Sequence, residues 1–165
     1  MRPQSEPNIV IRPIQPADKR LLERGMRRLS PESARLRFLA PKDHLTLAEL
    51  RYLTEIDYVR HYAVVAVRAE DPTDLVGVGR WVVDPARPHA AEMAIAVGDC
   101  YQGQGIGTAM GAALVEAARQ RGVTEFTASI LPESTPAQRL FARISERMSG
   151  RVENGIYEVS AQLAS

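Results

Sequence analysis

The N-terminal part of the chain changes from an alternating apolar pattern to a helical one. Residues 8–14 (NIVIRPI) carry Ile9 and Ile11 and include a proline, which predicts a first or edge strand. From Asp18 onward, leucine and methionine recur at helical spacing among basic residues, which predicts an amphipathic helix with a basic outer face. Such a charged face is typical of a solvated helix surface.

Two further helix starts follow. Ser30 and Pro31 match an N-cap followed by proline at the first helical position, which predicts a short helix that ends before Pro41. Thr46 and Glu49 match a capping box, in which each side chain accepts a hydrogen bond from the other residue's backbone N–H. We expect these early helices to form a lid-like layer on the substrate side of the molecule.

The middle of the chain has the pattern of β structure. Residues 61–69 (HYAVVAVRA) and 75–84 (LVGVGRWVVD) are apolar, β-branched runs separated by the turn-like residues 71–74, so they predict a hairpin. After a loop at residues 85–89, the run 90–97 (AAEMAIAV) predicts another strand. That strand leads directly into a glycine-rich stretch.

The C-terminal part combines helices and strands. Residues 107–121 have a helical apolar spacing and predict a long helix after the glycines. Residues 124–131 (TEFTASIL) predict a strand, and Thr135 is predicted to cap a further helix. Asn154-Gly155 between two β runs is the strongest short-range signal for a tight turn, so it predicts a final antiparallel hairpin.

Composition and charge limit the classes of function. The chain has 165 residues, of which 45% are hydrophobic, enough for one compact domain over residues 1–165. Its 21 basic and 20 acidic residues are well mixed and leave a formal charge of +1, which favours neither nucleic acid nor an anionic membrane as a partner. Because no apolar run could cross a bilayer and no signal-peptide core is present, we expect a soluble, cytoplasmic protein. One cysteine and 3 scattered histidines form no spaced ligand cluster, so we expect no metal.

The glycine-rich stretch that starts at Gln102 lies where a strand pattern stops and a helix pattern begins. The first N–H groups of a helix have no intrahelical partner and lie at the positive end of the helix dipole, so this junction predicts a phosphate site. The stretch lacks the lysine of a P-loop, and the third glycine position of a dinucleotide fingerprint falls on Thr108 or Met110. The pattern that remains is Gln-x-x-Gly-x-Gly, at Gln102, Gly105 and Gly107.

This loop, placed after a strand and before a helix, resembles that of the GNAT superfamily of acyl-coenzyme A dependent N-acetyltransferases. The predicted order over residues 8–163 is similar to that fold: strand, two helices, three antiparallel strands, helix, strand, helix and hairpin. Residues 11–18 (IRPIQPAD), 29–39 (LSPESARLRFL) and 91–107 (AEMAIAVGDCYQGQGIG) together look like the acetyltransferase domain of bacterial protein lysine acetyltransferases. The resemblance implies an α+β GNAT fold, with a mixed, mostly antiparallel sheet flanked by helices, and acetyl-CoA as co-substrate.

The resemblance also implies where coenzyme A binds. Backbone N–H groups of the glycine loop would hold the pyrophosphate, and the end of the preceding strand would pair with the pantetheine arm like an added strand. One N–H group of that strand end would polarise the thioester carbonyl. The cofactor-binding residues expected on this basis are Ile95, Ala96, Val97, Gln102, Gly103, Gln104, Gly105, Ile106, Gly107 and Thr108.

Transfer to an amine needs a base, because an amine with a pKa near 10.4 is mostly protonated at pH 7, a penalty of about 4.6 kcal/mol. Glu92 is the candidate for this catalytic role. If the odd-numbered residues of its strand pack into the core, strand alternation places Glu92, Ala94 and Ala96 on the opposite face, where the alanines leave room for substrate. The bacterial protein acetyltransferases that this region resembles use a glutamate at the matching position.

Some positions depart from the pattern of the superfamily. Phe141 stands where many members place a tyrosine that protonates the leaving thiolate, although the thiol of coenzyme A is acidic enough to leave without a donor. Ser134 replaces an asparagine that often contacts pantetheine. Cys100 lies near the loop, but direct transfer needs no acyl-enzyme, so we expect it to be an ordinary loop residue.

The favoured hypothesis is an N-acetyltransferase that moves an acyl group from acetyl-CoA to a primary amine by direct attack. The amine acceptor would be a protein lysine ahead of a small molecule, and the protein a monomer or a homodimer. The alternative is a non-catalytic acyl-CoA binding or sensing module. A nucleotide-dependent oxidoreductase is a third hypothesis, which would require affinity for NAD that survives competition by coenzyme A.

Overall fold

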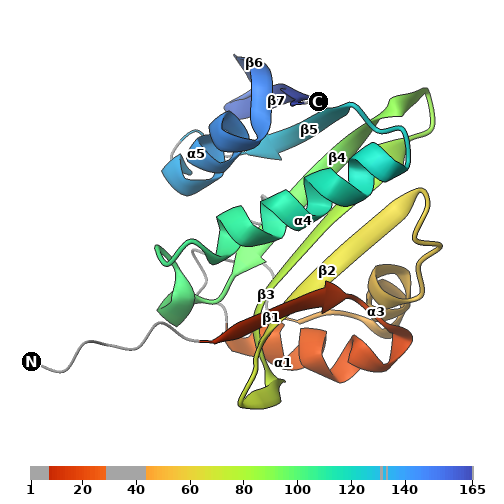
Figure 1. The fold of residues 1–165 in the computed structure, drawn as a ribbon, viewed down its shortest axis with the longest axis vertical. Helices are drawn as coiled ribbons and strands as arrows, with labels where there is room; N and C mark the ends of the chain where they lie inside the picture. The colour runs from red at the N-terminus through yellow and green to blue at the C-terminus, as the bar shows by residue number, and fades with distance from the viewer. Residues whose placement is uncertain (1–7, 29–43, 131, 133, 165) are drawn as a thin grey trace, which may run out of the picture.

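The computed structural model describes residues 8–28, 44–130, 132 and 134–164 (Figure 1). Its sheet of 7 strands has the order β1-β2-β3-β4-β5-β7-β6. In chain order the elements are β1 (Ile9–Pro13), a 3-10 turn η1 (Pro16–Asp18), α1 (Lys19–Arg28), α3 (Leu47–Thr54), β2 (His61–Arg68), β3 (Asp71–Asp84), β4 (Arg87–Val97), a 3-10 turn η2 (Asp99–Tyr101), α4 (Ile106–Gln120), β5 (Glu125–Ile130), α5 (Thr135–Ile144), β6 (Ser145–Glu153) and β7 (Ile156–Leu163).

Neighbouring strands of the sheet are antiparallel except where β4 meets β5. Those two central strands run parallel, with α4 as the crossover between them. In Figure 1 helix α4 runs across the sheet, β1, α1 and α3 lie at the lower end of the view, and β5, β6, β7 and α5 lie at the upper end. This arrangement confirms the predicted α+β fold with a mixed, mostly antiparallel sheet.

Helices α4 and α5 cover one face of the sheet. Met110 and Leu114 of α4 are fully buried there, and Phe141 of α5 is 3% exposed. Trp81 of β3 lies in the same core and donates its indole N–H to the Leu114 carbonyl at 3.1 Å. The buried indole is thereby satisfied, which fixes the position of α4 along β3.

Glycines on β3 determine how closely α4 approaches the sheet. A Cβ atom added at Gly79 would lie 3.0 Å from the Leu114 side chain, and one at Gly77 would lie 2.7 Å from Met110. On α4, a Cβ at Gly111 would lie 3.0 Å from Leu140 of α5. The absence of a side chain at Gly111 therefore lets α4 lie close to the neighbouring helix α5.

Helices α1 and α3 cover the opposite face at the β1 to β3 end. Leu22 of α1 and Leu50 of α3 pack there on alternate residues of β2, with Ile14 buried beside them. Helices α1 and α3 are among the early helices that the sequence predicts to form a layer on the substrate side of the molecule.

Local signals in the sequence predicted several helix and turn geometries. Thr46 and Glu49 form the capping box at the start of α3, with hydrogen bonds of 3.1 and 3.2 Å. Asn154 and Gly155 both have positive φ angles, 52° and 76°, which is the backbone of a two-residue type I′ hairpin turn. Both predictions are confirmed, because each depends on residues within one turn of chain.

Some predicted boundaries are wrong. Residues 71–74 and 87–89 are predicted in a turn and a loop, but they lie in β3 and β4. Asp71 pairs with Arg68 and Arg87 pairs with Asp84, and the register shifts between these pairs and the rest of each ladder. Thr135 is the first residue of α5 rather than its cap, and Ser134 holds the cap position without a side-chain hydrogen bond. The helix predicted to start at Ser30 lies outside the described residues.

Candidate functional site

Strands β4 and β5 separate in the middle of the sheet. Their parallel pairing joins residues 90–92 of β4 to residues 125–127 of β5. Strand β4 continues to Val97, and no strand of the described chain pairs with it on the β5 side after Glu92. The backbone N–H and C=O groups on that side are therefore open to a ligand that lies extended along β4.

The glycine loop follows directly from this open strand end. Gly103 and Gly105 have φ angles of 79° and 80°, a left-handed conformation that favours glycine. Gly105 is the N-cap of α4 and contributes no side-chain cap, and the first helical bond runs from the Ala109 N–H to its carbonyl. The N–H groups of residues 106–108 therefore lack intrahelical partners. They lie at the positive end of the helix dipole, where a negative charge is stabilised.

Two glutamine side chains hold the shape of this loop. Gln102 donates its amide N–H to the Val97 carbonyl at 3.1 Å, which ties the loop back to the end of β4. Gln104 donates to the Cys100 carbonyl at 3.2 Å. Both side-chain amides are used in hydrogen bonds to backbone carbonyls at the loop. The loop therefore offers a ligand mainly its backbone N–H groups.

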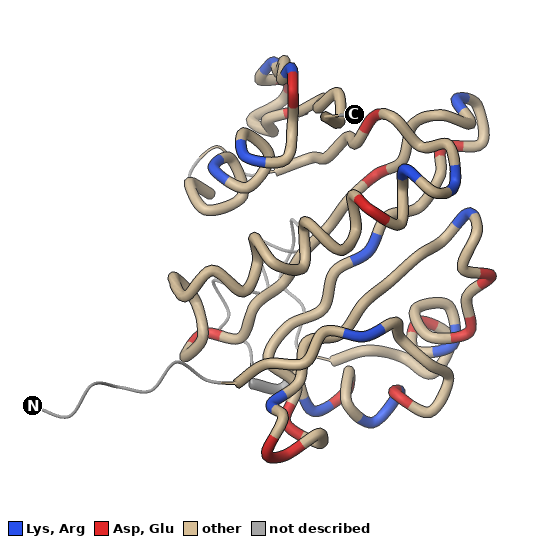
Figure 2. Tube along the Cα trace, in the orientation of Figure 1, with Lys and Arg blue, Asp and Glu red and all other residues tan. Residues whose placement is uncertain are grey.

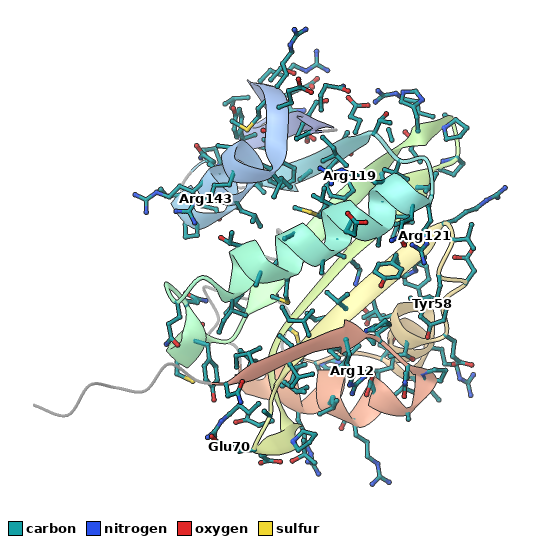
Figure 3. All side chains as sticks on the ribbon, in the orientation of Figure 1. Arg12, Tyr58, Glu70, Arg119, Arg121 and Arg143 are labelled. Carbon is teal, nitrogen blue, oxygen red and sulfur yellow. The ribbon has the colours of Figure 1, made fainter. Side chains whose placement is uncertain are left out.

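Arg143 is a further residue at the loop, and the sequence analysis did not identify it. It projects from the last turn of α5 and donates to the Thr108 hydroxyl at 3.2 Å (Figure 3). Its guanidinium thus lies at the N-terminal end of α4, where it adds positive charge to that of the helix dipole. The basic residue was visible in the sequence, but its partner lies 35 positions away, so only the packing of α5 on α4 brings them together.

Glu92 lies at the point where the two strands begin to separate. It is the last residue of β4 that pairs with β5, opposite Thr127, and it pairs with Val82 of β3 on its other side. Its side chain is exposed, whereas Ala91 and Met93 beside it are buried. Strand alternation therefore places it as predicted, on the sheet face opposite the main core, with Ala94 and Ala96. Val97 lies five residues farther along β4, which corresponds to about 17 Å at a rise of about 3.3 Å per strand residue.

A pocket of about 340 Å³ opens on the same sheet face as Glu92, between α1 and the end of β4. Ala96 and Gly98 form part of its wall, so the pocket adjoins the open segment of β4. Most of its other walls are apolar: Leu22, Met26, Leu45, Leu53, Leu75 and Val78. Helices α1 and α3 lie over the same face of the sheet.

The polar rim of the pocket includes Asp74 and Tyr101. The Tyr101 hydroxyl donates to the Asp74 carboxylate at 3.2 Å, and Arg68 lies 3.5 Å from the same carboxylate. Burial and the Asp74 charge raise the pKa of Tyr101. The Tyr101 hydroxyl is thus held against Asp74 beside the loop.

Two departures from the superfamily pattern have clear structural positions. Phe141 is in the core, 3% exposed, and so forms part of the packing of α5. Ser134 is 7% exposed at the cap of α5. Cys100 is exposed on η2.

Arg80 forms a buried polar contact at the inner end of the pocket. Its guanidinium donates to the Leu53 carbonyl at 3.0 Å and lies 2.8 Å from the His61 Nε2 atom. Beside them, the Asp57 carboxylate accepts the backbone N–H of His61 at 3.0 Å, and the Tyr58 carbonyl accepts from Arg121 at 2.5 Å (Figure 3). These contacts join the segment before β2 to the C-terminal end of α4.

Unfolding experiments at different pH values test this buried contact. Burial and the neighbouring Arg80 charge lower the pKa of His61 from 6.5 to about 4, against the smaller opposing effect of Asp57. The unfolded chain therefore binds the histidine proton more readily, so this contribution to stability is full above pH 6.5 and is lost as the pH falls toward 4. Urea unfolding should show a midpoint that decreases over this range.

His61→Gln keeps an acceptor for Arg80 without a titrating ring, so it should flatten the pH dependence. His89, exposed in β4, provides the matched control, and His89→Gln should keep the parent slope. An equal slope in His61→Gln and the parent would contradict the assignment.

The comparison with known families agrees with this geometry. The profile of the Acetyltransferase (GNAT) family matches residues 26–145. The chain belongs to the GNAT family of acetyltransferases. The matched range contains the open strand β4, the glycine loop, α4 and α5.

Relatives and solved structures extend the family match. Over 135 residues the chain is 33% identical to the acetyltransferase Pat of Mycolicibacterium smegmatis, covering 81% of this chain and 40% of that protein. The GNAT domain of S. lividans PAT has a TM-score of 0.83 at 23% identity, covering 99% of this chain and 100% of that one. The yncA protein of Salmonella typhimurium, whose structure contains acetyl-CoA, has a TM-score of 0.68 at 16% identity and covers 94% of both chains. This chain therefore spans less than half the length of the Pat relative.

The part of the chain that the structure describes has neither a bilayer-spanning helix nor a cluster of metal-binding side chains. No helix among residues 8–28 and 44–164, gaps excepted, is long and apolar enough to span a bilayer. No group of at least 3 histidine, cysteine, aspartate or glutamate side chains in the same part of the chain could hold a metal ion.

Proposed function

We propose that this chain transfers an acetyl group from acetyl-CoA to the amine of a protein lysine, by direct attack of the amine on the thioester. The observation that carries the proposal is the separation of β4 from β5 directly before an uncapped helix N-terminus. An extended arm that ends in a pyrophosphate needs such a combination: an open strand edge for its amides, and free N–H groups for its phosphates.

The coenzyme would lie along β4 with its pyrophosphate at the loop. Its amides would bond to the backbone groups that Ile95 and Val97 direct away from β3, with Ala96 between them, and its phosphates to the backbone N–H groups of residues 103–108. Arg143 would add a charged donor at the same place. The Gln102 and Gln104 side chains would keep the loop in the conformation that exposes those groups.

Glu92 would act as the base. The carboxylate would take a proton from the ammonium group of the acceptor, directly or through a water molecule. The free amine then attacks the thioester carbon, the C–N bond forms, the C–S bond breaks and the nitrogen releases a second proton to solvent, which leaves a neutral amide. The sulfur leaves as a thiolate that takes a proton from solvent. A backbone N–H of β4 would hold the carbonyl oxygen as it gains negative charge.

The acceptor would approach from the face that carries Glu92 and the pocket. A lysine side chain combines a long apolar stem with an amine at its end, and the walls of the pocket next to Ala96 are mainly apolar. The exposure of Glu92 supports a protein acceptor rather than an enclosed small-molecule site. The resemblance of residues 91–107 to bacterial protein lysine acetyltransferases agrees with this acceptor. Small amines are the second class of acceptor for the same chemistry.

Release of free thiol from acetyl-CoA tests this function directly. The chain is mixed with acetyl-CoA and with each member of a panel of lysine-containing proteins and small amines, and mass spectrometry identifies the acetylated product. Thiol release should depend on a protein acceptor and should leave acetyl-lysine. Release with small amines alone would replace the proposed acceptor, and coenzyme A binding without release for any acceptor would favour a sensing module.

A further inference from the structure

Strand β6 forms one edge of the sheet, at the upper end of the molecule in Figure 1. It is 9 residues long, and every residue after Ser145 is exposed. Its exposed apolar side chains are Met148 at 38% and Val152 at 64%. The same strand carries two acidic residues, Glu146 and Glu153, and two basic residues, Arg147 and Arg151, and Figure 2 shows both colours at this end of the molecule. A long strand with one unpaired side is a template for pairing with another strand.

The hairpin turn determines which backbone groups of β6 are free. In a two-residue turn the flanking residues, here Glu153 and Ile156, form a hydrogen-bonded pair. Hydrogen-bonded and non-hydrogen-bonded pairs alternate along an antiparallel ladder. The residues that direct their backbone N–H and C=O groups away from β7 are therefore Met148, Gly150 and Val152.

A second β6 strand can pair with this edge in few registers. Antiparallel pairing must place outward-directed residues opposite one another, so an even-numbered residue faces an even-numbered one. Centred on Gly150, the pairing brings Met148 opposite Val152 of the partner subunit, and Arg147 opposite Glu153 of the partner subunit. Each contact occurs twice because of the two-fold axis.

The neighbouring registers are electrostatically unfavourable. In a register centred on Ser149, Arg147 would face Arg151 of the partner subunit. In a register centred on Arg151, the two copies of Arg151 would face each other. A register centred on Met148 makes no ion pair and leaves Val152 and Glu153 outside the ladder. Centring on Val152 pairs only the last three residues of the strand. Charge and apolar contacts thus select the register centred on Gly150, since like charges directly opposite are destabilising.

We propose that β6 is a homodimer interface, in which two copies of the chain join their sheets edge to edge around Gly150. Gly150 suits the axis, because the Tyr157 ring occupies the space of its absent side chain and a Cβ there would lie 2.5 Å from that ring. The Arg151 and Glu153 side chains of one strand are 3.4 Å apart, so the two pairs Arg147 to Glu153 would extend this into a charge network across the axis.

Sedimentation velocity of the full chain over a concentration series tests the interface. The parent should sediment as a dimer that dissociates on dilution. Arg147→Glu and Glu153→Arg each place like charges opposite one another twice, so each should raise the dimer dissociation constant about tenfold or more. The double variant Arg147→Glu with Glu153→Arg restores opposite charges and should return to within about threefold of the parent.

Glu146→Arg is the matched control, because it reverses an exposed charge on the same strand that faces the partner's turn rather than a charged strand residue. It should leave dimerisation unchanged. A parent that stays monomeric at all concentrations would show that the charges of β6 keep the edge unpaired, and would overturn the proposal. A dimer that both single variants leave intact would place the interface elsewhere, with the same consequence.

Discussion

Replacing Glu92 by glutamine should lower the rate of acetyl transfer at neutral pH by about 10²–10⁴-fold, the range for loss of a positioned general base. The amide is close in shape to the carboxylate but cannot take a proton from the acceptor ammonium. As the pH rises toward the pKa of the amine, more of the acceptor is already neutral, so the loss should become smaller. Acetyl-CoA affinity should stay near the parent value, because the residue faces the acceptor rather than the loop.

Steady-state thiol release over a range of pH values measures this effect, with calorimetric titration of coenzyme A as the check on binding. Glu116→Gln is the matched control, since Glu116 is a carboxylate on the outer side of α4 with 61% of its side chain exposed. It should keep parent activity at every pH. A Glu92→Gln enzyme that acetylates as fast as the parent across the pH range would remove the base assignment.

Gly105→Ala should weaken coenzyme A binding by at least about tenfold, beyond any effect on folding. The residue has a φ of 80°, so a side chain there is strained by about 1–2 kcal/mol. The new methyl group also lies at the N-cap of α4, next to N–H groups that would meet the pyrophosphate. Titration with coenzyme A gives the affinity, and urea unfolding gives the change in stability.

Gly122 separates these two effects. It follows the other end of the same helix, has a φ of 76°, and, like Gly105, has no atom within 4 Å of an added Cβ. Gly122→Ala should therefore lose a similar free energy of unfolding and keep coenzyme A affinity. If the two variants bind coenzyme A equally well, the loop does not hold the pyrophosphate in the way that we propose.

Much of the local structure could be predicted because its causes are close together in the sequence. The capping box of α3 needs Thr46 and Glu49 within one turn, and the last hairpin needs two residues that tolerate positive φ. The boundaries of β3 and β4 could not be read in the same way. Residues 71–74 have turn chemistry, yet strand β3 already begins at Asp71, because Asp71 pairs with Arg68 and the ladder shifts register around residues 72–74.

In the candidate site, too, the features with local causes could be predicted from the sequence and the long-range contact could not. The position of Glu92 relative to its neighbours followed from strand alternation, because a side-chain period of two needs only the identity of the core face. The glycine loop was also visible, since positive φ angles and an uncapped helix start depend on residues in sequence order. Arg143 was not found, because its position near Thr108 depends on the packing of α5 on α4.

The sequence by itself determined the order of the elements, the glycine loop, the face on which Glu92 lies and the family to which the chain is similar. The tertiary structure decided where β4 leaves β5, which pocket lies beside the open strand, and which residues of β6 face outward. The physical reason is range: capping, turns and alternation act within a few residues. The opening in the sheet arises from strands and helices that are far apart in the chain and meet only in the folded protein.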